Sequence, residues 1–285
     1  MNRRTALRTT FGLSLGALTS PAWSGSAISK PTYQIGACDW SIGPAGSLGA
    51  FAVAKQIGLD GVQVSLNTAA DPEHLRRPET QQQFLAAARQ AGVQIGGLAI
   101  GLLNDVPYKS DPQTEQWVHD SVDVAKALGV KNVLLAFFNN NDLRNDPRGT
   151  QVVIDRLKAV APKAEQAGVV LGIESWLSAP EHLRILNAVG SPAVQVYYDV
   201  CNATDRGYDI FREMRELGRE HICEVHLKEN GHLLGQGQVD LNRVQQTLAE
   251  IGYAGWLQIE GAVPPGKPML DSYVQNNQTV RRIFG

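Results

Sequence analysis

The sequence lacks the features that mark several common classes of protein. It has only three cysteines in 285 residues, Cys38, Cys201 and Cys223, and no two of them show the CxxC spacing of a redox or zinc motif. An odd number of cysteines without that spacing does not describe a disulfide framework. We therefore expect buried free thiols, lying within the strands predicted below.

Long apolar runs and an excess of basic residues are also missing. Beyond residue 27 no apolar run is long enough to span a membrane. The whole chain has 26 Lys and Arg against 28 Asp and Glu, and residues 1–27 hold three of the arginines and none of the acids. The rest of the chain therefore carries a net charge of about −5, whereas nucleic-acid-binding proteins usually present a basic surface. We expect neither a nucleic-acid partner nor insertion into a membrane.

Residues 1–27 have the layout of an export signal. Arg3, Arg4 and Arg8 precede a short apolar run over residues 11–18, and small residues follow at 22–27. The paired arginines resemble a twin-arginine signal, which exports proteins that are already folded. We expect export to the periplasm and a mature chain that starts at residue 28; a basic leader without an address is the alternative.

From residue 33 onward, short apolar segments alternate with longer amphipathic ones. The short segments are rich in Val, Ile, Leu or aromatic residues and show little alternation of apolar and polar positions. This is typical of strands that are covered on both faces. Eight such strands are predicted: Gln34–Trp40, Gly61–Leu66, Gln94–Ile100, Asn132–Phe138, Val169–Glu174, Val194–Asp199, Cys223–Lys228 and Trp256–Glu260.

The amphipathic segments have helical spacing, and most of them end in a glycine just before the next strand. Glycine is the usual residue after the last helical turn. Eight strand–helix units predict an α/β fold, a (β/α)8 TIM barrel, formed as a single domain by residues 28–285. A doubly wound open sheet is the alternative, but no GxGxxG motif follows the first strand. The predicted helices include Ser47–Gly58, Pro78–Gly92, Pro112–Gly129, Arg148–Gly168, Ala179–Gly190 and Tyr208–Gly218.

The active site of such a barrel lies at the carboxyl ends of its strands. Strands five, six and eight end in Glu174, Asp199 and Glu260, and strand seven carries His226. Three clustered carboxylates would repel one another and acquire raised pKa values unless a cation neutralised them. One nitrogen and three oxygen ligands suit one divalent metal ion, Mn²⁺, Mg²⁺, Co²⁺ or Zn²⁺, and ligand type alone does not choose among these. We therefore predict one metal site built from these four residues.

Several motifs resemble those of the xylose-isomerase-like TIM barrels of sugar isomerases and epimerases. They are LGIES around Glu174, VYYDVCN around Asp199, EVHLKEN around His226, LGQGQVD at residues 234–240, and GYAGWLQIE leading to Glu260. The order Glu–Asp–His–Glu is similar to the metal quartet of the ketose 3-epimerase branch. The resemblance implies a metal-dependent sugar isomerase or epimerase, which moves a proton next to a carbonyl through an enediolate. It also implies that Glu174 and Glu260 form the acid/base pair, one on each face of the sugar.

Further residues near the strand ends are candidates for binding a small carbohydrate. Lys228 lies two residues after His226, on the same face of the strand. The resemblance implies a cationic substrate contact in the loop after strand seven, where His232 lies. Asn202 stands where ketose 3-epimerases commonly have a substrate-contacting His, and an amide keeps a hydrogen bond but not a charge. The remaining candidates are the flat faces of Trp40, Tyr108 and Trp176 and the amides of Asn104 and Asn139.

Other functions fit parts of the same pattern. Proton abstraction beside a 3-keto group can also end in elimination, which would give a lyase or hydrolase for 3-keto-glycosides or an inositol-like polyol. Export would favour such unphosphorylated substrates over cytoplasmic sugar phosphates. From another class, an exported sugar-binding barrel would keep the metal without catalysis, and a homo-oligomer is compatible with the sequence. A nuclease of the endonuclease IV type needs additional ligands on the early strands, whose ends show Trp40, Leu66, Ile100 and Phe138 instead.

Overall fold

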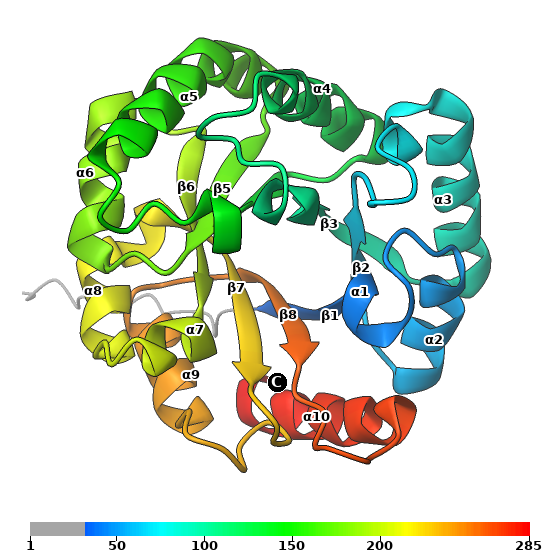
Figure 1. Ribbon diagram of the computed structural model, residues 1–285. Coiled ribbons are helices and arrows are strands. Elements are labelled where there is room, and N and C mark those ends of the chain that lie inside the picture. Colours follow the sequence, from blue (N-terminus) through cyan, green and yellow to red (C-terminus); the bar gives the residue numbers. More distant parts are fainter. Residues whose placement is uncertain (1–31) are drawn as a thin grey trace, which may run out of the picture. The chain divides into compact units, whose positions relative to one another are not determined.

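The computed structural model describes residues 32–285, and these residues form a closed barrel of eight parallel strands (Figure 1). Each strand pairs with the next one in the sequence, and the last pairs with the first. The predicted (β/α)8 barrel is therefore confirmed. The predicted export signal, residues 1–27, lies outside the described residues. The strands are β1 (Tyr33–Cys38), β2 (Gly61–Ser65), β3 (Gln94–Ile100), β4 (Asn132–Phe137), β5 (Val170–Ser175), β6 (Val194–Asp199), β7 (Ile222–Glu229) and β8 (Gly255–Gly261).

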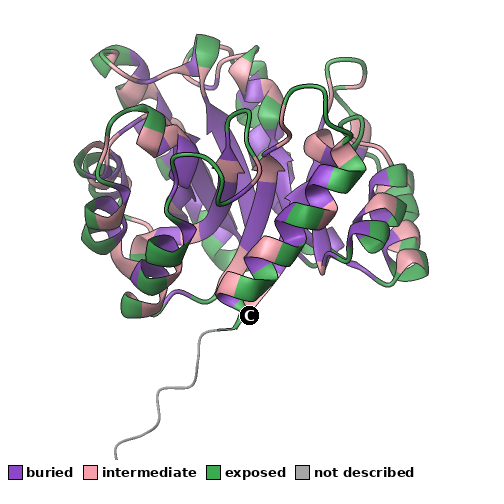
Figure 2. Ribbon diagram, turned by 90° about the horizontal axis from the view of Figure 1, so that it is seen from below, coloured by how far each residue is buried: buried purple, intermediate pink, exposed green. Residues whose placement is uncertain are grey.

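Helices surround the barrel, with their apolar sides turned to the strands and their exposed sides to the solvent (Figure 2). Among residues 32–285, no helix combines the length and the apolar character that a membrane span requires. The α-helices are α1 (Asp39–Ile42), α2 (Gly49–Ile57), α3 (Pro78–Ala91), α4 (Gln113–Leu128), α5 (Pro147–Ala167), α6 (Ala179–Val189), α7 (Val200–Asp205), α8 (Ile210–His221), α9 (Leu241–Glu250) and α10 (Met269–Phe284), and the 3-10 helices are η1 (His74–Arg76), η2 (Gly101–Asn104) and η3 (Asn139–Asn141).

Glycines end five of the helices that precede strands, as the sequence predicts. The five residues that follow α2 to α6 are glycines with φ between 69° and 86°, a left-handed conformation that only glycine adopts without strain. The helix predicted to end at Gly218 differs. Gly218 has φ 66° and ψ 174° and breaks α8, and a short second turn continues to His221.

The main apolar core lies between the strands and the helices, and the inside of the barrel is partly polar. Besides a small apolar cluster, the interior holds side chains such as Gln63, Glu224 and Gln258, all with no exposed surface. The cysteines are free, as predicted, and Cys38 and Cys201 are buried while Cys223 is half-buried. The prediction that all three lie in strands is wrong for Cys201, which lies in α7 because the strand ends at the residue that caps this helix.

Candidate metal centre

Four side chains converge at the carboxyl ends of β5 to β8. Glu174 lies on β5, Asp199 ends β6, His226 lies on β7 and Glu260 on β8. One ligand atom from each residue lies within 4.8 Å of the other three. The strand register explains this, because Asp199 pairs directly with His226, and Glu260 pairs with Lys228, two residues further along β7. The structure thus brings the predicted quartet together.

His226 has no exposed surface and turns its two ring nitrogens to different neighbours. Nδ1 faces the carboxylates, at 2.9 Å from Glu174 Oε1 and 3.6 Å from Glu260 Oε2. Nε2 lies 3.0 Å from Gln63 Oε1 on β2. Burial opposes a charge on the ring, but Cys38 and the carboxylates of Glu174 and Glu260 prevail and raise the pKa of His226 well above its usual value. A divalent ion at Nδ1 would replace the proton that these carboxylates attract.

Asp199 ends β6 and caps the first turn of α7. Its Oδ1 accepts hydrogen bonds from the backbone nitrogens of Cys201 and Asn202, both at 2.8 Å. Its Oδ2 is buried and has no hydrogen-bond partner within residues 32–285. Burial raises the pKa of Asp199 to about 7. A buried carboxylate oxygen without a donor is costly, and a cation at Oδ2 would remove that cost.

Glu260 is held by a donor at each oxygen. Trp40 Nε1 donates to Oε1 and Lys228 Nζ donates to Oε2, each at 2.9 Å. Burial alone would raise the pKa of Glu260, but the charges of His226 and Lys228 and these hydrogen bonds lower it to about 2. Glu260 is therefore ionised at neutral pH and able to accept a proton.

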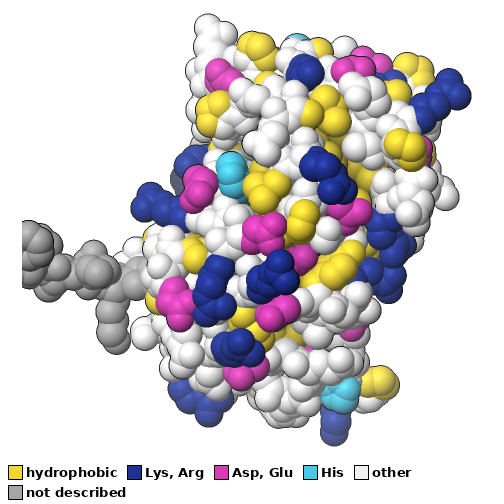
Figure 3. All heavy atoms as spheres, turned by 90° about the vertical axis from the view of Figure 1, so that its left-hand side faces the viewer, with side chains coloured by type: hydrophobic (Ala, Val, Ile, Leu, Met, Phe, Trp, Pro, Cys, Tyr) yellow, Lys and Arg dark blue, Asp and Glu magenta, His cyan; other side chains and the backbone are white. Residues whose placement is uncertain are grey.

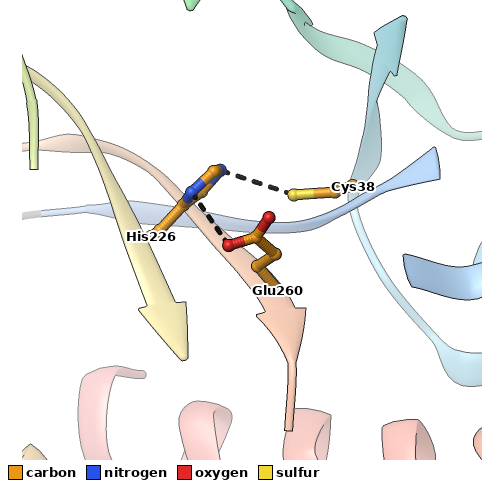
Figure 4. Close-up of side chains that lie close together, drawn as sticks. All are labelled: Cys38, His226 and Glu260. Carbon is orange, nitrogen blue, oxygen red and sulfur yellow. Dashed lines mark hydrogen bonds and ion pairs between the residues drawn. The ribbon is translucent and has the colours of Figure 1, made fainter. Parts of the chain in front are cut away.

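The quartet is a better candidate for binding a divalent metal ion than a second group of residues that contains a cysteine. Cys38, His226 and Glu260 also form a group whose ligand atoms lie within 4.8 Å of one another, and Figure 4 shows Cys38 and Glu260 at different nitrogens of the His226 ring. Burial raises the pKa of the Cys38 thiol to about 12, whereas thiolate is the metal-binding form. The quartet offers the ionised Glu260 and an unpartnered Asp199 Oδ2, so it is the better candidate.

A cavity of about 250 Å³ opens at this centre. Glu174 and Glu260 line it, while Asp199 and His226 lie beneath its surface. Six of the eight predicted substrate-binding residues also line the cavity: Trp40, Asn104, Asn139, Trp176, Asn202 and Lys228.

The other two predicted contacts lie elsewhere. His232 is exposed in the segment after β7 and is not among the residues that line the cavity. Tyr108 is 1% exposed and packs edge-on against Phe137 in the main core, so its ring face is not available to a sugar. The amide of Asn104 is partly engaged, because its Oδ1 accepts a hydrogen bond from the backbone nitrogen of Phe138 at 3.0 Å.

Trp176 forms a wall of the cavity between aromatic and cationic neighbours. Phe138 meets it edge-on at 5.1 Å between ring centroids. The guanidinium groups of Arg144 and Arg206 lie 4.7 Å and 5.4 Å from its ring centroid. Arg144 is paired with Asp142, whereas Arg206 makes no ion pair within residues 32–285. Arg206 therefore places a positive charge beside the ring of Trp176, a residue that lines the cavity.

Sequence reasoning missed a polar layer below the four residues. Tyr197, Glu224 and Gln258 stand two positions before Asp199, His226 and Glu260, so they face the same barrel interior. Burial raises the pKa of Glu224 to about 7, although the hydrogen bonds that it accepts act to lower this pKa. The two-residue spacing to each predicted ligand is the signal in the sequence that would have found this layer.

Comparison with known proteins identifies the family. A sequence model of the family described as "Xylose isomerase-like TIM barrel" matches residues 51–278. The chain is 29% identical over 224 residues to a 2-epi-5-epi-valiolone 7-phosphate 2-epimerase from Actinoplanes sp., covering 76% of this chain and 82% of the relative. It is 27% identical over 234 residues to an L-ribulose-5-phosphate 3-epimerase from Escherichia coli, covering 73% and 79%.

The fold also resembles solved structures. A 3-keto-D-glucoside 4-epimerase from E. coli superposes with a TM-score of 0.74 at 16% identity, over 88% of this chain and all of the other. At that identity the likeness concerns the fold, and it agrees with the barrel described above.

Proposed function

This chain belongs to the xylose isomerase-like TIM barrel family, and we propose that it is a divalent-metal-dependent sugar epimerase or isomerase that moves a proton next to a carbonyl group. The metal site rests on one main observation: the buried Asp199 Oδ2 has no hydrogen-bond partner within residues 32–285, and Asp199 is one of four residues whose ligand atoms lie within 4.8 Å of one another. Epimerases among the relatives support the reaction class.

Glu174, Asp199, His226 and Glu260 would hold the ion. When bound, it supplies Lewis-acid polarisation of the substrate carbonyl, which makes the adjacent C–H group acidic enough to lose a proton. Asp199 and His226 lie below the surface of the cavity, so we assign them to binding the ion. Glu174 and Glu260 line the cavity, where they would meet substrate as well.

Glu174 and Glu260 would exchange the proton. They come from β5 and β8, on either side of the two strands that carry the other ligands. Epimerisation requires removal of a proton from one face of a carbon and return from the other, so two carboxylates on separated strands suit it. The lowered pKa of Glu260 keeps it ionised as a base.

The cavity has room for a small substrate, and a positively charged side chain lies beside one of its walls. Its volume of about 250 Å³ lies near the lower limit for small-molecule sites. Trp176 and Trp40 offer apolar surface, and Asn139, Asn202 and Lys228 offer hydrogen-bonding groups. The names of two relatives include a phosphate, and the positive charge of Arg206 beside Trp176 would favour such a group. Free keto sugars, their phosphates and 3-keto-glycosides are therefore the substrates to compare.

The test is incorporation of solvent deuterium into these three substrate classes by protein loaded with Mn²⁺. We expect deuterium at the carbon next to the carbonyl of at least one substrate, and a loss of about 10²–10⁴-fold in Glu174→Gln and Glu260→Gln. Glu213→Gln is the control, because Glu213 is buried outside the site, under hydrogen bonds from Ala179 N and Tyr198. Exchange in no class with metal bound would contradict the proposal. Binding without exchange would instead indicate the sugar-binding alternative, and release of an aglycone would indicate the lyase.

A further inference from the structure

The candidate metal ligands rest on a second polar layer inside the barrel. Tyr197, Glu224 and Gln258 lie two positions before the ligands of β6, β7 and β8, and each is at most 1% exposed. On β5 the equivalent residue is Gly172, where a Cβ atom would lie 2.6 Å from Cys223 Sγ and 3.2 Å from Tyr197 Cβ. The missing side chain at Gly172 makes room for Cys223 and Tyr197 beneath the candidate metal ligands.

Glu224 accepts hydrogen bonds at both oxygens. Its Oε1 accepts from the Tyr197 hydroxyl at 2.9 Å and from Gln258 Nε2 at 2.8 Å, and its Oε2 accepts from Asn132 Nδ2 at 2.8 Å. Gln258 makes this bond although its own Oε1 stays buried without a partner within residues 32–285. Three donors point at its two oxygens, so Glu224 acts here as an acceptor only, in its carboxylate form. The hydroxyl proton of Tyr197 therefore points toward Glu224.

The hydrogen bond to Glu224 fixes which atoms donate and which accept in two further side chains, Tyr197 and Gln63, up to His226. Because the Tyr197 proton points to Glu224, the Tyr197 oxygen accepts from Gln63 Nε2, at 2.9 Å. The Gln63 amide therefore turns its Oε1 to the other side. There it meets two donors, the Cys38 thiol at 3.2 Å and His226 Nε2 at 3.0 Å. A carbonyl oxygen has two lone pairs and can accept both.

We propose that Glu224, Tyr197 and Gln63 form a hydrogen-bond relay that keeps a proton on His226 Nε2 and leaves the Nδ1 lone pair for a divalent ion. The three residues are positioning residues, since none of them lines the cavity. The metal part of this inference rests on the proposed function. Nδ1 is the nitrogen that faces Glu174, at 2.9 Å, so the relay selects the nitrogen that the other ligands require. Groups that hydrogen-bond to metal ligands in this way orient the ligands and influence the affinity of the site for the metal.

The test uses two relay variants and two matched controls. Tyr197→Phe cuts the relay, and Glu224→Gln allows its direction to reverse. Tyr198→Phe and Glu213→Gln alter a second buried tyrosine–glutamate pair, joined at 3.1 Å, that does not contact His226. The measurements are Mn²⁺ affinity by calorimetry at pH 8 and the NMR signals of ¹⁵N-labelled histidine in the metal-free and Mg²⁺-loaded protein.

We expect Mn²⁺ affinity to fall about 10–100-fold in the relay variants and less than about threefold in the controls. In wild type, His226 Nε2 should carry a slowly exchanging, hydrogen-bonded proton with and without Mg²⁺, and this signal should be lost in Tyr197→Phe. Unchanged affinity in the relay variants, or an equal loss in the controls, would overturn the proposal. If wild type bound no metal, the proposed function would fail. Loss of the slowly exchanging Nε2 proton signal in metal-free Tyr197→Phe, but not in metal-free Tyr198→Phe, would still decide whether the relay exists.

Discussion

At the scale of single residues, Lys228 offsets part of the negative charge of the candidate metal ligands. Its Nζ lies 2.9 Å from Glu260 Oε2 and 3.8 Å from Asp199 Oδ2. Burial would lower the pKa of Lys228, but these carboxylates raise it, so the side chain stays charged. With three carboxylates, a divalent ion and one lysine, the centre is neutral overall, and the removal of Lys228 would leave one negative charge uncompensated.

We predict that Lys228→Met moves the acidic limb of the kcat/KM profile to higher pH by about one unit or more. An opposite charge within this distance lowers a carboxyl pKa by about 1–3 units, so its loss raises the pKa of Glu260. Because Glu260 must be ionised to accept a proton, activity then disappears at a higher pH on acidification. The measurement is the pH dependence of kcat/KM with saturating metal. Lys163→Met, which removes a surface pair with Asp123, is the control, and an unshifted limb would contradict the assignment.

The residues at the strand ends could be predicted from the sequence, whereas the contacts that residues inside the strands make with one another could not. Glu174, Asp199, His226 and Glu260 stand out because a charged or ionisable residue follows an apolar run at a known edge of the fold. Gln63 and Tyr197 stand among apolar neighbours and read as ordinary strand positions. Their role depends on contacts between β2, β6 and β7, which are far apart in the sequence. Only the closed barrel brings them together.

At the scale of elements, the eight strands agree with their predicted ranges to within two residues at each end. The glycines after α2 to α6 helped to place the strands that follow them, because glycine is the usual residue after the last helical turn. The short helices α1 and α7 and the 3-10 helices were not predicted. They span three to six residues, too few to show a helical period of apolar residues. One of them, α7, is capped by Asp199 itself, so a candidate metal ligand also starts a helix.

The segment between β7 and α9 illustrates why one glycine of the LGQGQVD motif is needed. Glu229, at the end of β7, is 3% exposed and accepts hydrogen bonds from the backbone nitrogens of Gln238 at 3.2 Å and Val239 at 3.0 Å. A Cβ atom on Gly237 would lie 2.1 Å from Glu229 Oε2. The glutamate therefore folds the segment back onto the strand, and Gly237 permits the close approach.

We predict that Gly237→Ala lowers the free energy of unfolding by about 1–3 kcal/mol, the usual cost of forcing an extra methyl group into a packed site. Hydrogen exchange should increase in residues 230–239, because the hydrogen bonds to Glu229 are lost. Mn²⁺ affinity should stay the same, since this segment holds none of the four ligands. Gly43→Ala is the control, because its backbone is extended at φ 177° and its nearest neighbour would be 4.0 Å away. Equal stability of the two variants would show that the segment is held in another way.

At the scale of the whole molecule, the alternation of strands and helices predicts the barrel, but the cavity depends on the folded shape. The surface mixes acidic, basic and apolar side chains, as Figure 3 shows for one face. Export by residues 1–27 remains a prediction, since these residues lie outside the described part of the chain. The centre itself links chemistry to folding, because four strands must close correctly before the carboxylates come together.

We therefore predict that Mn²⁺ stabilises the whole barrel, and more strongly at pH 8 than at pH 6. The pKa of Asp199 is raised to about 7 in the metal-free fold, so its contribution to stability is full below the unfolded value of about 4 and is lost as the pH rises through 7. Mn²⁺ binds the ionised form and offsets this loss. At a hundredfold excess over Kd the gain is about 2.7 kcal/mol, or roughly 5–11 °C in Tm for a chain of this size. Thermal unfolding with Mn²⁺ or EDTA at both pH values measures it, and Asp199→Asn should remove both the metal-induced shift and its pH dependence. A metal-induced shift that is the same at both pH values, or that persists in Asp199→Asn, would show that the ion binds elsewhere.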